Sequence, residues 1–242
     1  MYDVVADLLL GGACAACGGP GRPLCRPCER DLPREPRVVW PTPTPPGLAL
    51  PMAAGEYAGA LKALVNAHKE HQLLALAAPL GDLLAVVVAG HLARTVPTAR
   101  WGAGVVVVPV PSRPAVVRRR GHDPMLRVAR RAAARLRRDG LPVVVARPLR
   151  AHARVRDQSG LGAEERRANL QGAFVCRRPA APGVRPVLVV DDVLTTGATV
   201  RAAQRALDDA GHRVVGIATV AATRRRSGLH GDPSLPLSPV GG

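Results

Sequence analysis

The stretch VLVVDDVLTTGAT, residues 187–199, predicts three consecutive features of an α/β protein. Val187–Val190 is a short run of aliphatic residues, which is typical of a buried strand. Two carboxylates and a Thr-Thr-Gly turn follow, and we expect a helix that starts near Thr199 and stops at Gly211. Such a helix would bury three apolar side chains on one face: Val200, Ala203 and Leu207.

The same pattern recurs along the chain and extends the prediction to a whole sheet. Further runs of β-branched residues lie at Val105–Val108, Val143–Val145 and Val214–Ile217. Helical segments are expected between them, and two more upstream at Tyr57–Lys69 and Leu80–Arg94. Strands that alternate with helices favour a parallel sheet covered on both faces, so the predicted fold class is α/β.

One helix has clear sequence boundaries. Asp123 is an expected N-cap, and Pro124 suits the first helical position, where its missing N–H costs nothing. The helix is expected to run to about Arg138, with Asp139-Gly140 ending it. The residues expected to face the sheet are Leu126, Ala129, Ala133 and Leu136.

The turn after the strand at 187–190 has the chemistry of a phosphate site. Backbone N–H groups of a tight Thr-Thr-Gly turn can converge on a phosphate, and the helix N-terminus adds positive partial charge. Gly197 permits the close approach and the unusual φ of such a turn. Asp191 and Asp192, at the carboxyl end of the strand, are placed to accept hydrogen bonds from two ribose hydroxyls. The alternative is a turn whose acids only cap the helix.

The whole run resembles the signature of type I phosphoribosyltransferases, which bind phosphoribosyl pyrophosphate together with Mg²⁺. The resemblance implies catalytic roles for Asp191 and Asp192. It implies ligand contacts for the residues that follow: Val193, Leu194, Thr195, Thr196, Gly197, Ala198 and Thr199. It indicates the ligand class and leaves the acceptor open.

A second loop fits the same ligand. The strand at Val105–Val108 leads into Pro109-Val110-Pro111-Ser112-Arg113, and Arg118-Arg119-Arg120-Gly121 follows. In phosphoribosyltransferases the loop after the first core strand contacts the pyrophosphate, which arginine binds well through forked hydrogen bonds. The candidates here are Val110, Pro111, Arg113 and Arg120. The alternative is a proline-stiffened turn beside a solvated basic run.

Four of the five cysteines lie near the N-terminus in two Cys-x-x-Cys pairs: Cys14, Cys17, Cys25 and Cys28. This spacing brings four thiolates within reach of one tetrahedral Zn²⁺. Disulfides are the alternative, but the chain is expected in a reducing compartment. A redox centre would need one such motif in a βαβ context. The sequence therefore predicts structural zinc, with Cys176 an inert thiol.

A four-cysteine module ahead of a phosphoribosyltransferase core resembles the ComF family of competence-related proteins. The similarity spans about Leu8–Ala222. Further matching residues are Tyr57, Leu61, Lys62, Lys69, Gln158, Arg166, Arg167, Asn169, Gly172, Ala173 and Phe174. One departure is His122-Asp123-Pro124, where the family usually shows Phe-Asn-Gln. The resemblance implies a link to incoming single-stranded DNA in transformable bacteria and leaves the phosphoribosyl acceptor unsettled.

The segment Ala151–Gly172 is long, polar and basic, and it falls where phosphoribosyltransferases carry a flexible loop over the substrate. A closing loop would exclude water from the reacting centre. The arginines that could approach the leaving pyrophosphate are Arg154, Arg156, Arg166 and Arg167. A solvated basic loop is the alternative for each of them.

The formal net charge of +16 has two interpretations. Of the 34 basic residues 32 are arginine, which indicates either a composition bias or a surface for a polyanion such as single-stranded DNA. One predicted helix face carries a line of them: Arg127, Arg131, Arg135 and Arg138. Aromatic residues make up only 2% of the chain, so DNA binding would be mostly electrostatic and strongly salt-dependent.

The expected organisation is a zinc module with a leading helix (1–34), a Pro-rich linker (35–50), a phosphoribosyltransferase-like domain (51–225) and a disordered tail (226–242). No membrane span is expected, because the most apolar stretch, Leu73–Ala93, is interrupted by Pro79, Gly81, Asp82 and His91. The N-terminus shows no basic leader, which favours a cytoplasmic protein.

Three functions are compatible with these features. The favoured one is an enzyme that transfers the phosphoribosyl group to a nitrogen acceptor. The others are a non-catalytic phosphoribosyl-binding protein and a module that handles single-stranded DNA.

Overall fold

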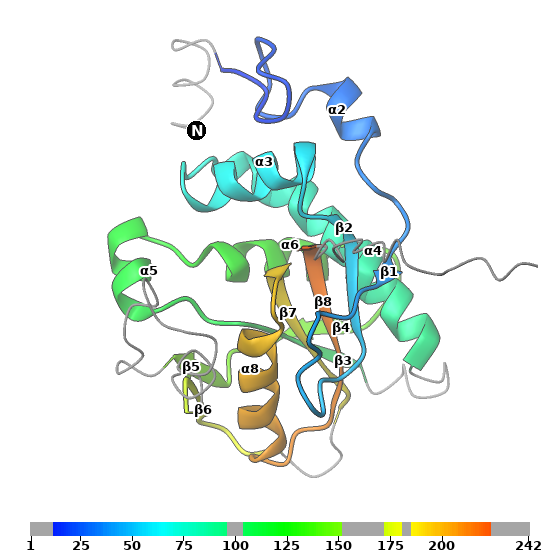
Figure 1. The fold of residues 1–242 in the computed structure, drawn as a ribbon, viewed down its shortest axis with the longest axis vertical. Helices are drawn as coiled ribbons and strands as arrows, with labels where there is room; N and C mark the ends of the chain where they lie inside the picture. Colours follow the sequence, from blue (N-terminus) through cyan, green and yellow to red (C-terminus); the bar gives the residue numbers. More distant parts are fainter. Residues whose placement is uncertain (1–11, 96–103, 152–171, 181–184, 224–242) are drawn as a thin grey trace, which may run out of the picture.

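A six-stranded sheet forms the centre of the protein (Figure 1). The computed structural model describes residues 12–95, 104–151, 172–180 and 185–223. The strands, in spatial order, are β1 (Arg37–Val38), β2 (Pro51–Glu56), β8 (Val214–Ala222), β7 (Val187–Leu194), β3 (Val105–Pro109) and β4 (Val143–Val145). All neighbours pair in parallel except β1, which is antiparallel to β2. The predicted α/β class is therefore confirmed.

Helices cover both faces of this sheet (Figure 1). α4 (Ala77–Thr95) and α6 (Pro124–Arg138) pack on one face and α8 (Ala198–Asp208) on the other. The remaining α-helices are α2 (Arg26–Arg30), α3 (Gly59–Lys69) and α5 (Pro114–Arg120). Alternate residues of β7 point to opposite faces, so Leu188 and Val190 pack with α4 and α6, whereas Val187 and Val189 pack with α8. Each face of the sheet thus has its own apolar core.

Two predicted strands are longer in the structure than the apolar runs that predicted them. β7 continues from Val190 to Leu194, and β8 continues from Ile217 to Ala222. The two extensions pair with each other, with Asp191 opposite Thr219 and Val193 opposite Ala221. Asp191 and Asp192 therefore lie inside β7, near its carboxyl end. This corrects the expectation that the strand stops before them.

The helix boundaries follow the predicted caps closely. Asp123 accepts a hydrogen bond from the Leu126 N–H at 3.3 Å, and Pro124 is the first residue of α6. These residues, which depart from the ComF pattern, therefore have a structural role here. α8 begins at Ala198, buries its predicted apolar face and ends at Asp208, three residues before Gly211.

Two strands lie where the sequence shows no strand pattern. β2 is rich in Ala and Gly and still pairs with β8 over its length. β1 lies inside the segment 35–50, for which a linker is predicted, and forms the edge of the sheet. A further antiparallel ribbon joins β5 (Leu149–Ala151) to β6 (Phe174–Cys176). Most of the predicted loop 151–172 lies outside the described residues, between these two strands.

In the described part of the chain one helix, Leu74–Thr95, is long and apolar enough to cross a membrane by length and composition. Pro79, Gly81, Asp82 and His91 do not interrupt it as expected. Pro79 lies in the first turn, where a helix tolerates proline. In its most apolar window 56% of the residues are buried, and its neighbours are the sheet and α6, as for the core helix of a globular domain.

Candidate functional site

Two carboxylates and a lysine meet at the end of β7. Asp191 and Asp192 are partly buried, and the Lys69 ammonium lies 2.8 Å from an Asp192 carboxylate oxygen. Lys69 is the last residue of α3, where the helix dipole favours a cation. α3 lies at the end of the sheet toward which β7 and β8 point (Figure 1). The ion pair therefore joins this covering helix to the carboxyl edge of the sheet.

The three charges shift one another's protonation. Burial, together with the neighbouring charge of Asp192, raises the pKa of Asp191 to about 8. Burial lowers the pKa of Lys69, but the attraction of Asp192 outweighs it and the net pKa is raised. Two neighbouring carboxylates that share one cation can attract a second positive charge. This arrangement suits a ligand that brings a divalent cation or several hydroxyl donors.

The turn that follows β7 presents polar groups to solvent. Thr195, Thr196 and Thr199 are exposed, and Gly197 adopts a left-handed φ of 73° at the N-cap of α8. The Gly197 carbonyl accepts the first hydrogen bond of the helix, from the Arg201 N–H at 2.9 Å. Hydroxyl groups and a helix N-terminus thus lie together, as a phosphate site requires.

Gly197 is also required by its neighbours. A Cβ at this position would lie 3.0 Å from Pro41 and 3.3 Å from Pro45. The segment that carries these prolines is held on α8: Gln204 donates to the Gly47 carbonyl at 3.1 Å and accepts from the Ala49 N–H at 3.0 Å. The proline-rich segment therefore packs directly behind the turn and supports its shape.

The loop after β3 lies beside the acidic pair. The Val110 N–H donates to the Val190 carbonyl at 2.9 Å, which places Val110 next to the start of the Asp191-Asp192 pair. Pro111 and Arg113 follow, and Arg113 is the N-cap of α5. Arg120 is placed differently, because its side chain is only 9% exposed and forms an ion pair with Glu70. In this structure Arg120 ties α5 to the end of α3.

The comparison with protein families agrees with this geometry. The family described as "Phosphoribosyl transferase domain" matches residues 84–232, more than half of the chain. The chain belongs to this family. Its phosphoribosyltransferase domain thus includes the loop after β3, the Asp191-Asp192 pair and the turn before α8. No curated protein matches the chain.

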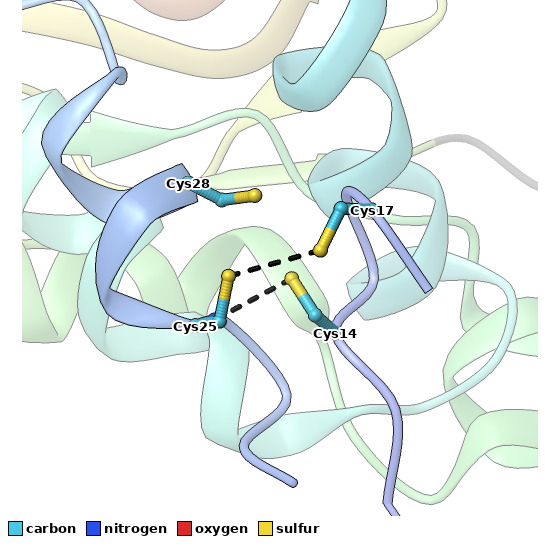
Figure 2. Close-up of side chains that lie close together, drawn as sticks. All are labelled: Cys14, Cys17, Cys25 and Cys28. Carbon is cyan, nitrogen blue, oxygen red and sulfur yellow. Dashed lines mark hydrogen bonds between the residues drawn. The ribbon is translucent and has the colours of Figure 1, made fainter. Parts of the chain in front are cut away.

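Four cysteines cluster in the module that precedes the phosphoribosyltransferase domain (Figure 2). Their sulfur atoms all lie within 4.8 Å of one another, and the Cys17 and Cys25 sulfurs are 3.8 Å apart. All four thiols are free. Sulfurs bound at ~2.3 Å to one tetrahedral Zn²⁺ would lie ~3.8 Å apart, so the cluster fits zinc. Cys14, Cys17, Cys25 and Cys28 could therefore hold one zinc ion.

The thiols compete for protons within this cluster. Burial raises the pKa of Cys14, but backbone N–H groups, first that of Cys25, outweigh it and lower that pKa to about 6. Hydrogen bonds that the Cys28 thiol donates to Cys25 and Cys17 raise the pKa of Cys28 to about 12. A bound metal ion replaces these shared protons, which is the usual chemistry of a four-thiolate site.

The structure adds one residue to the predicted site. Lys69 was noted only as a match to the ComF pattern, although it is one of just two lysines in an arginine-rich chain, which was a usable signal. Its pairing with Asp192 depends on the docking of α3. Four arginines predicted to approach the pyrophosphate lie outside the described residues: Arg154, Arg156, Arg166 and Arg167.

Proposed function

We propose that the protein binds phosphoribosyl pyrophosphate with Mg²⁺ and transfers its phosphoribosyl group to a nitrogen acceptor. The observation that supports this most is the continuous run from the Asp191-Asp192 pair to the exposed threonine turn at the start of α8. Membership of the phosphoribosyl transferase domain family agrees with it. Asp191, Asp192 and the turn Thr195–Thr199 are the residues on which the proposal depends.

The turn and the two carboxylates have different roles in the proposed reaction. The turn binds the 5-phosphate through backbone N–H and hydroxyl groups, while the two carboxylates accept hydrogen bonds from the ribose hydroxyls. Mg²⁺ would neutralise charge that develops on the departing pyrophosphate. In the reaction the C1–O bond breaks and pyrophosphate leaves with its electron pair. A C1–N bond forms, and the acceptor nitrogen loses a proton to water. Positioning and charge stabilisation account for the rate, so no nucleophilic side chain is needed.

A hollow of about 980 Å³ opens beside the phosphate turn and offers a place for the acceptor. Thr195 lies on its wall, together with Ala222 and Thr223 at the end of β8. Trp40, which is 51% exposed, and Glu56, the strand partner of Ala222, also line it. An aromatic face and a carboxylate suit a flat, nitrogen-containing acceptor, and we propose that the acceptor enters here.

The test of the phosphate and ribose site is a binding measurement. Titration calorimetry with phosphoribosyl pyrophosphate and Mg²⁺ should show affinity that falls about 100-fold or more in the double variant Asp191→Asn/Asp192→Asn, because two charge-assisted contacts are lost. The matched control is Asp208→Asn/Asp209→Asn, a second acidic pair at the other end of α8. It should bind within twofold of the parent. Equal affinity in the two double variants would refute the assignment.

Turnover separates an enzyme from a binding protein that uses the same site. Release of pyrophosphate should be measured across a panel of nucleobases, amines and DNA ends. Release that depends on one acceptor supports the transferase. Binding without release for every acceptor tested would favour the phosphoribosyl-binding alternative.

The link to DNA uptake and the cytoplasmic location are finer proposals that rest on the resemblance to ComF and on the sequence. The arginine line on α6 is less available than expected, since Arg135 forms ion pairs with Asp82 at 3.5 Å and Asp139 at 2.9 Å. Any contact of α6 with single-stranded DNA would therefore depend on the other arginines of that face: Arg127, Arg131 and Arg138.

A further inference from the structure

A second hollow, of about 1040 Å³, lies on the α8 side of the sheet, between the ribbon β5–β6 and the start of β7. Its described walls carry five arginines: Arg147, Arg150, Arg177, Arg178 and Arg185. No carboxylate is among the described residues that line it. The hollow therefore has strong positive charge and is suited to an anion.

The floor of this hollow is apolar. Val106 of β3 and Val145 of β4, which are half-buried, line it together with Val108 and Val187, which are almost fully buried. Ligand-binding cavities commonly combine apolar side chains with a few charged ones, and the volume is near the upper end of their usual range. The ligand expected here has a flat, weakly polar part as well as several negative charges.

Arginine is more frequent among the residues that line the hollow than in the chain as a whole. Five of the fourteen described lining residues are arginine, compared with 32 of 242 in the whole chain. Arg120 and Arg135 elsewhere are paired with carboxylates. In the described ranges, by contrast, none of the five forms an ion pair. All five arginines are exposed.

Backbone hydrogen bonds hold the walls in place. The Arg177 N–H donates to the Pro148 carbonyl at 2.9 Å, which closes the base of the ribbon. The His212 Nε2 donates to the Arg178 carbonyl at 2.8 Å, and the Ala180 N–H donates to the Ala210 carbonyl at 3.0 Å. The ribbon is thereby attached to the turn between α8 and β8, so its arginines project from fixed backbone positions.

This hollow is separate from the proposed phosphoribosyl site. Val187 and Arg185 lie at the start of β7, whereas the phosphate turn follows its end at Leu194. At about 3.3 Å per residue, the seven steps along this strand span roughly 23 Å. Val108 of β3 is the lining residue nearest to the acidic pair, since it pairs with Val189, two positions before Asp191, so the arginines, and not the valines, distinguish the two places.

We propose that the arginine-lined hollow binds a nucleoside triphosphate. Guanidinium groups bind phosphate oxygens through paired, charge-assisted hydrogen bonds, and five of them balance the charge of a triphosphate without a metal ion. The valine floor takes one face of the base, and an arginine can stack on the other. The site is independent of the proposed transferase activity.

The experiment measures ATP binding by calorimetry in the presence of EDTA. Arg150→Gln/Arg177→Gln should weaken binding at least about tenfold, because two guanidinium contacts are lost. The matched control, Arg130→Gln/Arg138→Gln on α6, makes the same change of charge and should stay within twofold. Asp191→Asn/Asp192→Asn should also retain ATP binding, and excess phosphoribosyl pyrophosphate should not displace ATP. Thermal unfolding of each variant confirms that it is folded.

Three results would overturn the proposal. One is the absence of ATP binding, or an equal loss in the α6 control, which would mean that only net charge matters. Another is loss of ATP binding in Asp191→Asn/Asp192→Asn, which would place the nucleotide in the phosphoribosyl site. The third is binding of inorganic triphosphate, or of a single-stranded oligothymidylate in place of ATP, with the same affinity and the same arginine dependence. Equal binding of inorganic triphosphate would mean that the valine floor plays no part, and equal binding of the oligothymidylate would mean that the ligand is a nucleic acid.

Discussion

The charge of one carboxyl group, Asp191, links the stability of the protein to its proposed function. Its pKa is raised to about 8 by burial and by Asp192, and Lys69 offsets this only in part. The ligand-free site therefore keeps a proton at neutral pH that a bound cation would displace. The ionised form of Asp191 is therefore unfavourable for the folded state. Such residues are common at functional sites, where function and stability conflict.

Replacement of Asp191 by asparagine should stabilise the protein at high pH. Because the folded pKa lies above the ordinary value of 3.8, the stability that this group contributes is complete below about pH 4 and is lost as pH rises through about 8. Asp191→Asn should remove that loss, with a gain of up to about 6 kcal/mol at pH 9 and a smaller one of about 1–2 kcal/mol at pH 5, at about 1.4 kcal/mol per pH unit. Urea unfolding at both pH values measures it, with Asp209→Asn as the control. Parallel pH profiles for parent and Asp191→Asn would contradict the prediction.

At the scale of elements, α4 docks on the sheet through one polar contact inside an apolar interface. His91 is fully buried, and its Nε2 lies 3.0 Å from the Leu50 carbonyl while its Nδ1 lies 2.9 Å from the Thr95 hydroxyl. The ring occupies the space above Gly216 of β8, where a Cβ would lie 1.7 Å from Nε2. A glycine in a central strand is normally unfavourable, and here it makes room for the histidine.

Gly216→Ala should therefore be strongly destabilising. The methyl group and the imidazole cannot share the same space, so we expect a loss of about 3 kcal/mol or more of unfolding free energy. The second substitution in Gly216→Ala/His91→Ala removes the clash and should recover part of this loss. Chemical denaturation of both variants tests the pair. Gly140→Ala is the control, since a Cβ there meets open space and only its φ of 84° is unfavourable; a similar loss in that variant would argue against the specific contact.

At the scale of the whole molecule, the cysteine module shares the core of the phosphoribosyltransferase domain. Cys14, Leu24 and Leu32 belong to the same buried cluster as Leu61 and Leu64 of α3. α3 in turn carries Lys69 to the acidic pair. The conformation of the module is thus connected, through one packed helix, to the edge of the sheet where the proposed substrate binds.

Zinc removal should weaken this connection. Protein purified without chelator is expected to contain close to one zinc ion per chain. Its removal should lower the midpoint of thermal unfolding by about 4–8 °C, the equivalent of roughly 2 kcal/mol in a chain of this size. Elemental analysis and thermal unfolding before and after chelation measure both values, and Cys176→Ser serves as a control outside the cluster. Absence of metal, with all four thiols alkylated in the native protein, would contradict the zinc prediction.

Features that depend on neighbours in the chain could be predicted from the amino-acid sequence. Runs such as Val143–Val145 predict strands, and the caps of α6 and the glycine turn before α8 follow from residues only a few positions apart. The spacing of the four cysteines, similarly, predicted a cluster that the structure brings together. The roles assigned to Asp191, Asp192 and the threonine turn remain predictions that the proposed experiments address.

Which distant residues come into contact depends on the tertiary structure and could not be predicted from the sequence. β2 has no β-branched pattern and becomes a strand because β8 offers it a partner. Lys69 reaches Asp192 because α3 docks over the edge of the sheet, and Arg120, predicted to bind pyrophosphate, pairs with Glu70 for the same reason. The five arginines of the second hollow come from three separate segments of the chain. Periodicity reports the face on which a side chain lies, whereas its partner depends on packing between elements far apart in sequence, which no local pattern encodes.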